Sequence, residues 1–321
     1  MYGRTLPKRI LGYWKKQRLF KKRLNECLCN IRPDITISLL RRDINFINKV
    51  KDGSIKIGEI HFNKSDYRAF NDNHLPMFLQ RIVKEHWRRQ LIRQLRQLKR
   101  FIVLSHEDAA QWTELNNVSV IYNPLPFYPG VSSDNSQKQV IAVGRYVPQK
   151  GFDRLIPAWK IVSEQHPDWT LRIYGDGMRE KLQQQIDSLG ISSNCVLEHS
   201  VPNIVDKYCE SSIFVLSSRF EGFGMVIIEA MACGVPPVSF TCPCGPRDII
   251  TDGKNGLLVE NGDIEGLAGK ICYLIENEKV RKEMGKQARI NVERFKIEHV
   301  AQEWRELFET LTKQPYSDQL S

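Results

Sequence analysis

The sequence predicts an α/β protein in which parallel strands are covered by helices on both faces of a sheet. Short apolar segments alternate with segments of helical period through most of the second half of the chain. Glycine-containing loops follow several of the apolar segments, as in open parallel sheets that bind ligands at the carboxyl ends of their strands. The 321 residues are enough for two domains with separate cores.

The first predicted domain covers residues 1–128 and is rich in Lys and Arg. Its expected elements are a helix at 7–30, strands at 35–40 and 55–60, a long basic helix at 75–100, a strand at 101–104, a short helix at 107–115 and a strand at 118–122. Proline and polar residues then interrupt the pattern, and we place a linker at 129–138.

The second predicted domain covers residues 139–297 and alternates regularly between strand and helix. Its expected strands are at 139–143, 170–174, 196–198, 213–216, 236–240 and 256–259, with helices at 152–165, 178–189, 204–209 and 225–232. Residues 264–313 are expected to be helical, and we expect the C-terminal helix within 298–321 to pack back toward the first domain.

Charge is distributed unevenly along the chain. The net charge is +10, but residues 1–110 carry 25 Lys and Arg against 10 Asp and Glu. This asymmetry indicates an acidic partner for the first domain, such as nucleic acid, anionic lipid or a phosphorylated acceptor. No apolar run is long enough to span a membrane and no signal peptide is apparent, so a cytoplasmic protein is expected. The eight cysteines lack zinc-binding spacing and are interpreted as packing residues or inert thiols.

A loop with two glycines precedes the apolar helix predicted at 225–232. Gly222 and Gly224 lead directly into this helix, whose only charged residue is Glu229. Unpaired backbone N–H groups and the positive end of the helix dipole favour a bound phosphate at such a position. Ile227 stands where the third glycine of a dinucleotide fingerprint would be, which disfavours a classical dinucleotide-binding fold.

Two further loops follow predicted strands. After residue 143, Arg145 and Lys150 place two cations near a turn, which suits a diphosphate, although both could equally be ordinary surface cations. The run Gly175-Asp176-Gly177 after residue 174 is a weak signal shared by many turns.

Two carboxylates, Glu221 and Glu229, are expected to face the same ligand. Side chains lean toward the N-terminus of a helix, so Glu229 is expected to point back toward the loop that holds Glu221. A carboxylate accepts hydrogen bonds from two adjacent hydroxyls, which suits a ribose or a sugar diol. The alternative for Glu229 is a buried acid paired with a cation.

Several motifs together resemble a known enzyme family. They are Gly144-Arg145 with Lys150-Gly151-Phe152, Gly175-Asp176-Gly177, residues 218–236 with the E-x7-E pair Glu221 and Glu229, and Asp252-Gly253 with residues 255–259. Residues 118–259 thereby resemble the retaining glycosyltransferases of family 4. The resemblance implies the GT-B fold of two facing Rossmann-like domains, a nucleotide-sugar donor bound mainly by the second domain, and no required metal or other cofactor.

The resemblance also implies roles for particular residues. It assigns Arg145 and Lys150 to the diphosphate, Glu229 to the ribose hydroxyls and Glu221 to the donor sugar. His61 resembles the family's histidine near the donor sugar, with an inconsequential loop histidine as the alternative. The expected catalytic residues are Glu221, His61, Arg145 and Lys150, and the expected donor-binding residues are Gly144, Arg145, Lys150, Gly175, Glu221, Gly222, Phe223, Gly224, Met225 and Glu229.

The first domain departs from the family pattern. Family members begin with a strand, a glycine-rich loop and further strands, whereas this sequence starts at the helix predicted for residues 7–30. We therefore expect an N-terminal domain without its first strands, an exposed sheet edge and low activity of this chain alone.

The sequence thus predicts a hexosyltransferase that uses a UDP-sugar, or else a GDP-sugar, to extend a surface polysaccharide or lipid-linked glycan. The basic helix at 75–100 is expected to dock on anionic lipid with Trp14 and Trp87 at the interface, unless it is simply a charged outer face. The alternatives are a nucleotide-sugar epimerase of the same fold, a non-catalytic nucleotide-sugar-binding protein, or a nucleic-acid-binding protein, for which no motif is present.

Overall fold

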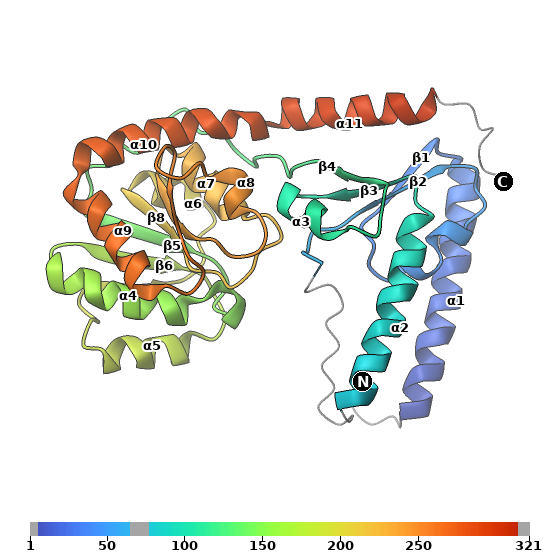
Figure 1. Cartoon of the computed structure of the whole chain (residues 1–321), viewed down its shortest axis with the longest axis horizontal. Coiled ribbons are helices and arrows are strands. Elements are labelled where there is room, and N and C mark those ends of the chain that lie inside the picture. Colours follow the sequence, from blue (N-terminus) through green and yellow to red (C-terminus); the bar gives the residue numbers. More distant parts are fainter. Residues whose placement is uncertain (1–5, 65–76, 314–321) are drawn as a thin grey trace. The chain divides into compact units, whose positions relative to one another are not determined.

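The computed structural model describes residues 6–64 and 77–313, which form two compact units (Figure 1). The first unit comprises Met1–Leu104, Ala109–Ile121 and Glu303–Ser321, and the second comprises Ser105–Asp108 and Tyr122–Gln302. The chain crosses between the units after Leu104, Asp108, Ile121 and Gln302, and the long continuous part of the second unit begins at Tyr122, before the residues expected to form the linker.

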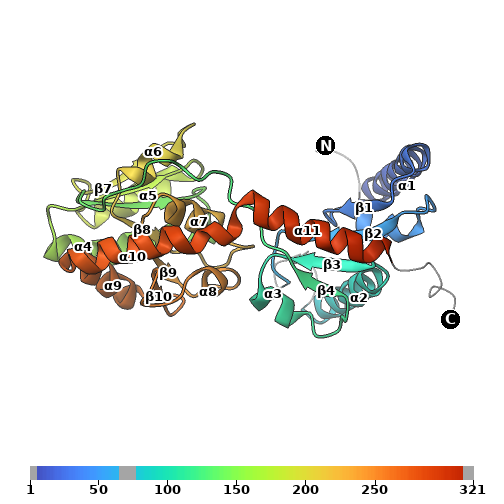
Figure 2. The same cartoon turned by 90° about the horizontal axis from the view of Figure 1, so that it is seen from above.

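The first unit contains a four-stranded parallel sheet with the order β1-β2-β3-β4. Its elements are α1 (Leu6–Ile31), β1 (Ile35–Ser38), the 3-10 turns Asp43–Asn45 and Ile47–Lys49, β2 (Ile55–Glu59), α2 (Met77–Arg96), β3 (Arg100–Val103) and β4 (Val118–Val120), and α3 (His106–Gln111) is divided between the two units. Figure 2 shows β3 and β4 side by side. The start of the basic helix expected at 75–100 lies outside the described residues.

The core of the first unit packs the later part of α2 against β3, Trp112 and apolar residues of 40–60. Ile92 and Leu95 of α2 are buried, and Leu28 of α1 packs in a smaller cluster with Phe46. Trp87 of α2, which was predicted to lie at a lipid interface, is 41% exposed. The beginning of α2 does not contribute its large apolar residues to this core, since Met77 and Phe78 are 87% and 68% exposed.

The first strand lies at one edge of its sheet. Among the described residues β1 pairs only with β2, and Ile37 and Leu39 at this edge are 42% and 50% exposed. Parallel strands are usually covered on both faces and paired on both sides. The edge is therefore apolar and open to water within the described part of the chain.

The second unit contains six parallel strands in the order β10-β9-β8-β5-β6-β7. Its elements are β5 (Gln139–Val143), α4 (Phe152–Gln165), β6 (Thr170–Tyr174), α5 (Arg179–Ser188), β7 (Cys195–Glu198), α6 (Ile204–Cys209), β8 (Ile213–Leu216), α7 (Met225–Ala232), β9 (Pro237–Phe240), α8 (Pro246–Ile249), β10 (Leu257–Val259), α9 (Ile264–Glu276) and α10 (Glu278–Asn291). The helix α11 (Ile297–Thr312) begins in this unit and ends in the first. All six strands were predicted, whereas α8 was not.

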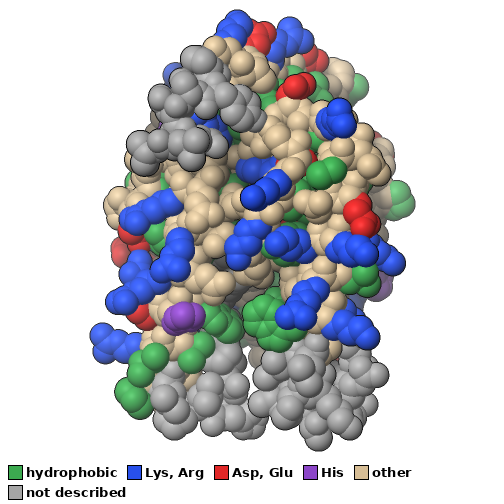
Figure 3. Space-filling model, turned by 90° about the vertical axis from the view of Figure 1, so that its right-hand side faces the viewer, with side chains coloured by type: hydrophobic (Ala, Val, Ile, Leu, Met, Phe, Trp, Pro, Cys, Tyr) green, Lys and Arg blue, Asp and Glu red, His purple; other side chains and the backbone are tan. Residues whose placement is uncertain are grey.

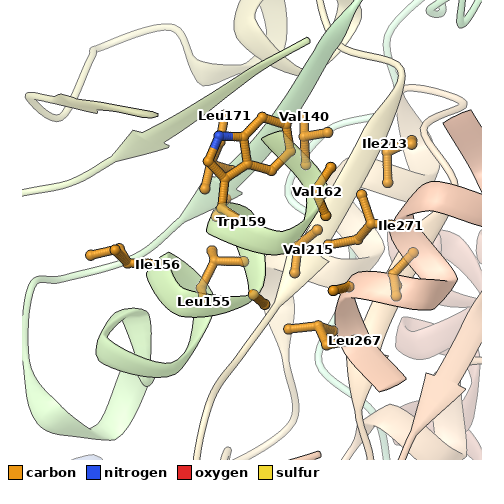
Figure 4. Close-up of a cluster of buried hydrophobic side chains, with 14 of the residues drawn as sticks. Val140, Leu155, Ile156, Trp159, Val162, Leu171, Ile213, Val215, Leu267 and Ile271 are labelled. Carbon is orange, nitrogen blue, oxygen red and sulfur yellow. The ribbon is translucent and has the colours of Figure 1, made fainter. Parts of the chain in front are cut away.

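A buried apolar cluster joins the sheet of the second unit to α4 and α9 (Figure 4). Trp159 of α4 is fully buried, and its ring nitrogen donates a hydrogen bond to the carbonyl of Asn194 at 3.0 Å. Burying side chains such as Leu155 and Ile271 contributes about 2 kcal/mol each. This core fixes the strands whose carboxyl ends carry the candidate site.

Candidate active site

Three loops of the second unit emerge side by side at the carboxyl edge of the sheet. They follow β6, β5 and β8, which are consecutive in the sheet order. The chain reaches β6 from β5 through α4 and reaches β9 from β8 through α7, so the connections run in opposite directions from this point. Such a switch in strand order is the usual ligand-binding position of an open parallel sheet.

Backbone hydrogen bonds join the loops after β5 and β6. Gly144 N–H donates to the carbonyl of Tyr174 at 2.9 Å, and Tyr146 N–H donates to that of Asp176 at 2.8 Å. A Cβ atom at Gly175 would lie 1.9 Å from the Gly144 carbonyl oxygen. Only glycine allows this close approach, so the weak Gly-Asp-Gly signal has a structural cause.

A second set of contacts joins the loops after β5 and β8. The Arg219 guanidinium forms a bidentate ion pair with Asp153, with N–O distances of 2.7 and 2.6 Å. The backbone N–H of Arg219 donates to the carbonyl of Gln149 at 2.8 Å. Gly151 has φ of +65°, and a Cβ there would lie 2.1 Å from the Ser217 carbonyl oxygen. These contacts hold the backbone around Lys150 beside the loop that carries Glu221.

Lys150 and Glu221 form the central ion pair of the site. The Lys150 Nζ lies 2.7 Å from Glu221 Oε1, and the Ser218 hydroxyl donates to the same oxygen at 2.6 Å. Only 15% of the Lys150 side chain and 8% of the Glu221 side chain are exposed. The Glu221 N–H donates to the carbonyl of Pro243 at 2.7 Å, which fixes the backbone as well.

Glu229 lies one helix turn into α7 and is bound to Tyr208. The Tyr208 hydroxyl donates to Glu229 Oε2 at 3.1 Å. Burial raises the pKa of Glu229 above its usual value, while the Tyr208 hydrogen bond and the charge of Lys150 partly oppose that rise. The close partner is thus a hydroxyl, and not the cation considered as an alternative. The Lys150 charge acts on both carboxylates.

The loop before α7 presents backbone groups and hides its aromatic side chain. Phe223 is 3% exposed and packs against Tyr122 and Phe295, with ring centroids 5.5 Å apart in both pairs. Gly224 precedes α7 with φ of +100°, and no side chain caps the helix. The N–H groups of the first turn are therefore the polar groups at this end of the helix.

The remaining predicted residues are less closely connected to the ion pair. The Arg145 side chain is exposed, and Gly222 is partly exposed. His61 belongs to the first unit, where its Nε2 lies 3.1 Å from Glu59 Oε1 and 41% of its side chain is exposed. The structure therefore groups Gly144, Arg145, Lys150, Gly175, Glu221, Gly222, Phe223, Gly224, Met225 and Glu229 in one unit and places His61 in the other.

Sequence reasoning missed the residues that support the site. These are Asp153, Tyr208, Ser217, Ser218 and Arg219. Ser218 and Arg219 stand in the loop already singled out, but Asp153 and Tyr208 pair with residues distant in sequence, so no local pattern indicates their partners.

The comparisons with known proteins identify the family. The sequence model of Glycosyl transferases group 1 matches residues 129–291, which include all three loops. The chain belongs to this family. It is 28% identical over 77% of its length to the poly(ribitol-phosphate) α-N-acetylglucosaminyltransferase of Staphylococcus aureus, and 33% identical over 54% of its length to the capsular polysaccharide biosynthesis glycosyltransferase CapM of the same species.

A solved glycosyltransferase confirms the expected fold class. The crystal structure of an S. aureus TarM variant in complex with fondaparinux, α-GlcNAc-glycerol and UDP has a TM-score of 0.69 and 26% identity over 85% of this chain. The two parallel-sheet units are those of a GT-B glycosyltransferase. The chain spans 51% and 46% of the two curated relatives and 55% of the solved chain, so it corresponds to about half of each of them.

Proposed function

We propose that this protein is a retaining glycosyltransferase that moves a hexose from a nucleotide diphosphate sugar to a glycan or lipid-linked acceptor in surface polysaccharide synthesis. The observation that carries the proposal is the largely buried pair of Lys150 and Glu221 at the carboxyl edge of the sheet. A nucleotide sugar offers phosphate oxygens to the ammonium and sugar hydroxyls to the carboxylate. A UDP-sugar is favoured over a GDP-sugar because the solved TarM relative is a complex with UDP.

In the proposed reaction the bond between the anomeric carbon and the phosphate oxygen breaks. The oxygen of an acceptor hydroxyl bonds to that carbon on the same face, and the acceptor proton is released. Negative charge grows on the departing diphosphate, where Lys150, Arg145 and the N–H groups before α7 would stabilise it. The proposal needs no metal ion, since these groups supply the positive charge.

The two carboxylates have different proposed roles. Glu221 is proposed to bind and orient the donor sugar, and Glu229 to accept hydrogen bonds from the ribose hydroxyls. The Tyr208 hydroxyl leaves Glu229 with further acceptor capacity for such bonds. His61 is proposed as a catalytic residue on the family resemblance alone.

A nucleotide-sugar screen tests the proposal directly. UDP, GDP and a panel of their sugars are added to the protein and the melting temperature is measured, because a ligand that binds only the folded state stabilises it by about 2.7 kcal/mol at 100 times its Kd. UDP-sugars are expected to raise the melting temperature most. The proposal fails if no nucleotide diphosphate or nucleotide sugar raises it.

Turnover separates the transferase from the alternatives. Glu221→Ala is expected to abolish release of UDP from the best-bound UDP-sugar, whereas Glu283→Ala, which removes an exposed carboxylate of α10, is expected to leave it unchanged. Retained turnover in Glu221→Ala would contradict the site. An isomerised sugar nucleotide as the product would indicate an epimerase, and binding without turnover a non-catalytic protein.

The basic first unit is proposed to bind an anionic membrane surface peripherally, at the inner face of the cell membrane. Trp14 of α1 is 60% exposed and Trp87 of α2 is 41% exposed, on helices that also carry many Lys and Arg residues. Figure 3 shows one face of the molecule on which many Lys and Arg side chains are spread, with some hydrophobic side chains between them. Within residues 6–64 and 77–313, no helix is long and apolar enough to cross a bilayer.

Vesicle flotation tests this partner. Vesicles containing phosphatidylglycerol are expected to carry the protein at low salt, and the double variant Lys15→Glu and Lys16→Glu to bind less. The matched control is Lys282→Glu and Lys286→Glu, which makes the same charge change on α10 of the other unit. Equal binding of neutral and anionic vesicles, or an equal loss in both variants, would refute the proposal.

A further inference from the structure

Ser218 is a buried serine that contacts the carboxylate proposed to hold the donor sugar. It follows β8 and is 1% exposed, and its hydroxyl donates to Glu221 Oε1 at 2.6 Å. Lys150 Nζ contacts the same oxygen at 2.7 Å from the loop after β5. The orientation of Glu221 is therefore set by side chains from two loops.

We propose that Ser218 is a positioning residue that keeps Glu221 directed at the donor sugar while Lys150 binds the diphosphate. This inference rests on the proposed function. The Lys150 ammonium is a mobile point charge on a flexible stem, and a diphosphate would compete with Glu221 for it. The Ser218 hydroxyl has no charge to share with phosphate and a short side chain, so it stays on Glu221 and continues to satisfy this largely buried carboxylate.

The neighbouring serine has a different contact, which provides a close comparison. Ser217 is also 1% exposed, but its hydroxyl donates to the backbone carbonyl of Lys150 at 2.9 Å. Ser217 thus holds the diphosphate loop, whereas Ser218 holds the sugar-binding carboxylate.

Binding of UDP with and without its sugar distinguishes these roles. Calorimetry gives two dissociation constants for each variant. One is the Kd of UDP, and the other is the Kd of whichever of UDP-glucose, UDP-galactose and UDP-N-acetylglucosamine binds the wild type most tightly. In Ser218→Ala the Kd of UDP is expected to stay within about twofold of the wild-type value, while the UDP-sugar is expected to bind no more tightly than UDP. The kcat is expected to fall by about 10- to 100-fold, which is the usual effect of losing a hydrogen bond to a charged group. Ser218→Thr, which keeps the hydroxyl, is expected to recover most of kcat.

Two controls accompany this measurement. Ser217→Ala is expected to weaken UDP and the UDP-sugar by the same factor, because it acts on the loop of Lys150. Ser163→Ala removes another buried serine, whose hydroxyl donates within α4 to the Lys160 carbonyl, and is expected to change neither Kd nor kcat. A Ser218→Ala protein with wild-type kcat and wild-type preference for the UDP-sugar overturns the inference.

A structural measurement tests the role without any turnover. Crystal structures of the wild type and of Ser218→Ala are compared in the presence of UDP. In the wild type the Glu221 carboxylate is expected to stay on the Ser218 hydroxyl while Lys150 contacts the diphosphate, and in the variant it is expected to leave this place. If the wild type binds no UDP, the proposed function fails. A Glu221 side chain that keeps its wild-type place in UDP-bound Ser218→Ala overturns the positioning role.

Discussion

The Lys150–Glu221 pair predicts strong energetic coupling between substitutions of its two members. The perturbation is a double-mutant cycle of Lys150→Met, Glu221→Gln and the combination. At an N–O distance of 2.7 Å, the gross Coulomb attraction is about 6 kcal/mol at an effective dielectric constant of about 20. Removing two charges from water offsets most of this attraction, because both side chains are largely buried. A net coupling of about 2 kcal/mol is expected.

Urea unfolding at pH 7 provides the assay. Each single substitution is expected to lower the unfolding free energy by about 3 kcal/mol, because it leaves the opposite charge buried without its ion-pair partner. The loss of unfolding free energy should be smaller in Lys150→Met than in Glu221→Gln, since Ser218 still donates a hydrogen bond to Glu221. The double variant should lose about 2 kcal/mol less than the sum of the two. Additivity within about 0.5 kcal/mol would refute this account of the site.

Three further predictions concern Arg219, Glu229 and Gly245. Arg219→Ala removes the ion pair with Asp153. Because both side chains are partly exposed, the unfolding free energy should fall by only about 1 kcal/mol, while the Kd of UDP should rise. An unchanged Kd of UDP would contradict the role of this ion pair in holding the loop of Lys150. Burial raises the pKa of Glu229 above 4.5, so the stability associated with its protonated form is present below pH 4.5 and is lost as the pH rises through the raised pKa. Glu229→Gln should therefore raise the melting temperature near pH 7 and flatten its pH dependence above pH 4.5, and a lower melting temperature at pH 7 would contradict this. Gly245 has a φ of +108°, and Gly245→Ala would place a Cβ 1.7 Å from the Phe223 carbonyl oxygen. The unfolding free energy measured in urea is therefore expected to fall by more than about 2 kcal/mol. Wild-type stability would show that the loop adapts to the added Cβ.

Local pattern was sufficient for most elements of the second unit. The helices α4 and α7 have the predicted bounds, because Gly151 and Gly224 stand at their beginnings and apolar residues recur along them. The four residues of β8 are fully buried, so this strand is a continuous apolar run. The short α8 was missed because four residues are too few to establish a helical period.

In the first unit, the apolar pattern of a helix did not reveal which part of that helix is buried. Apolar residues recur along α2, and Ile92 and Leu95 are buried while Trp87 is exposed. The pattern identifies the helix and its apolar residues. It does not say how much of the helix lies against the core, and that extent depends on the lengths of the packed elements.

The sequence by itself determined which residues could serve the site. Glycine at tight turns, cations after β5 and carboxylates around α7 are local choices, and each has local chemistry that a short window reveals. Tertiary structure alone decided which of them meet. Lys150 and Glu221 are 71 residues apart, and Arg219 and Asp153 are 66 apart. These pairs form because β5 lies next to β8 in the sheet, and that order is set by packing of the whole unit, so no segment encodes it separately.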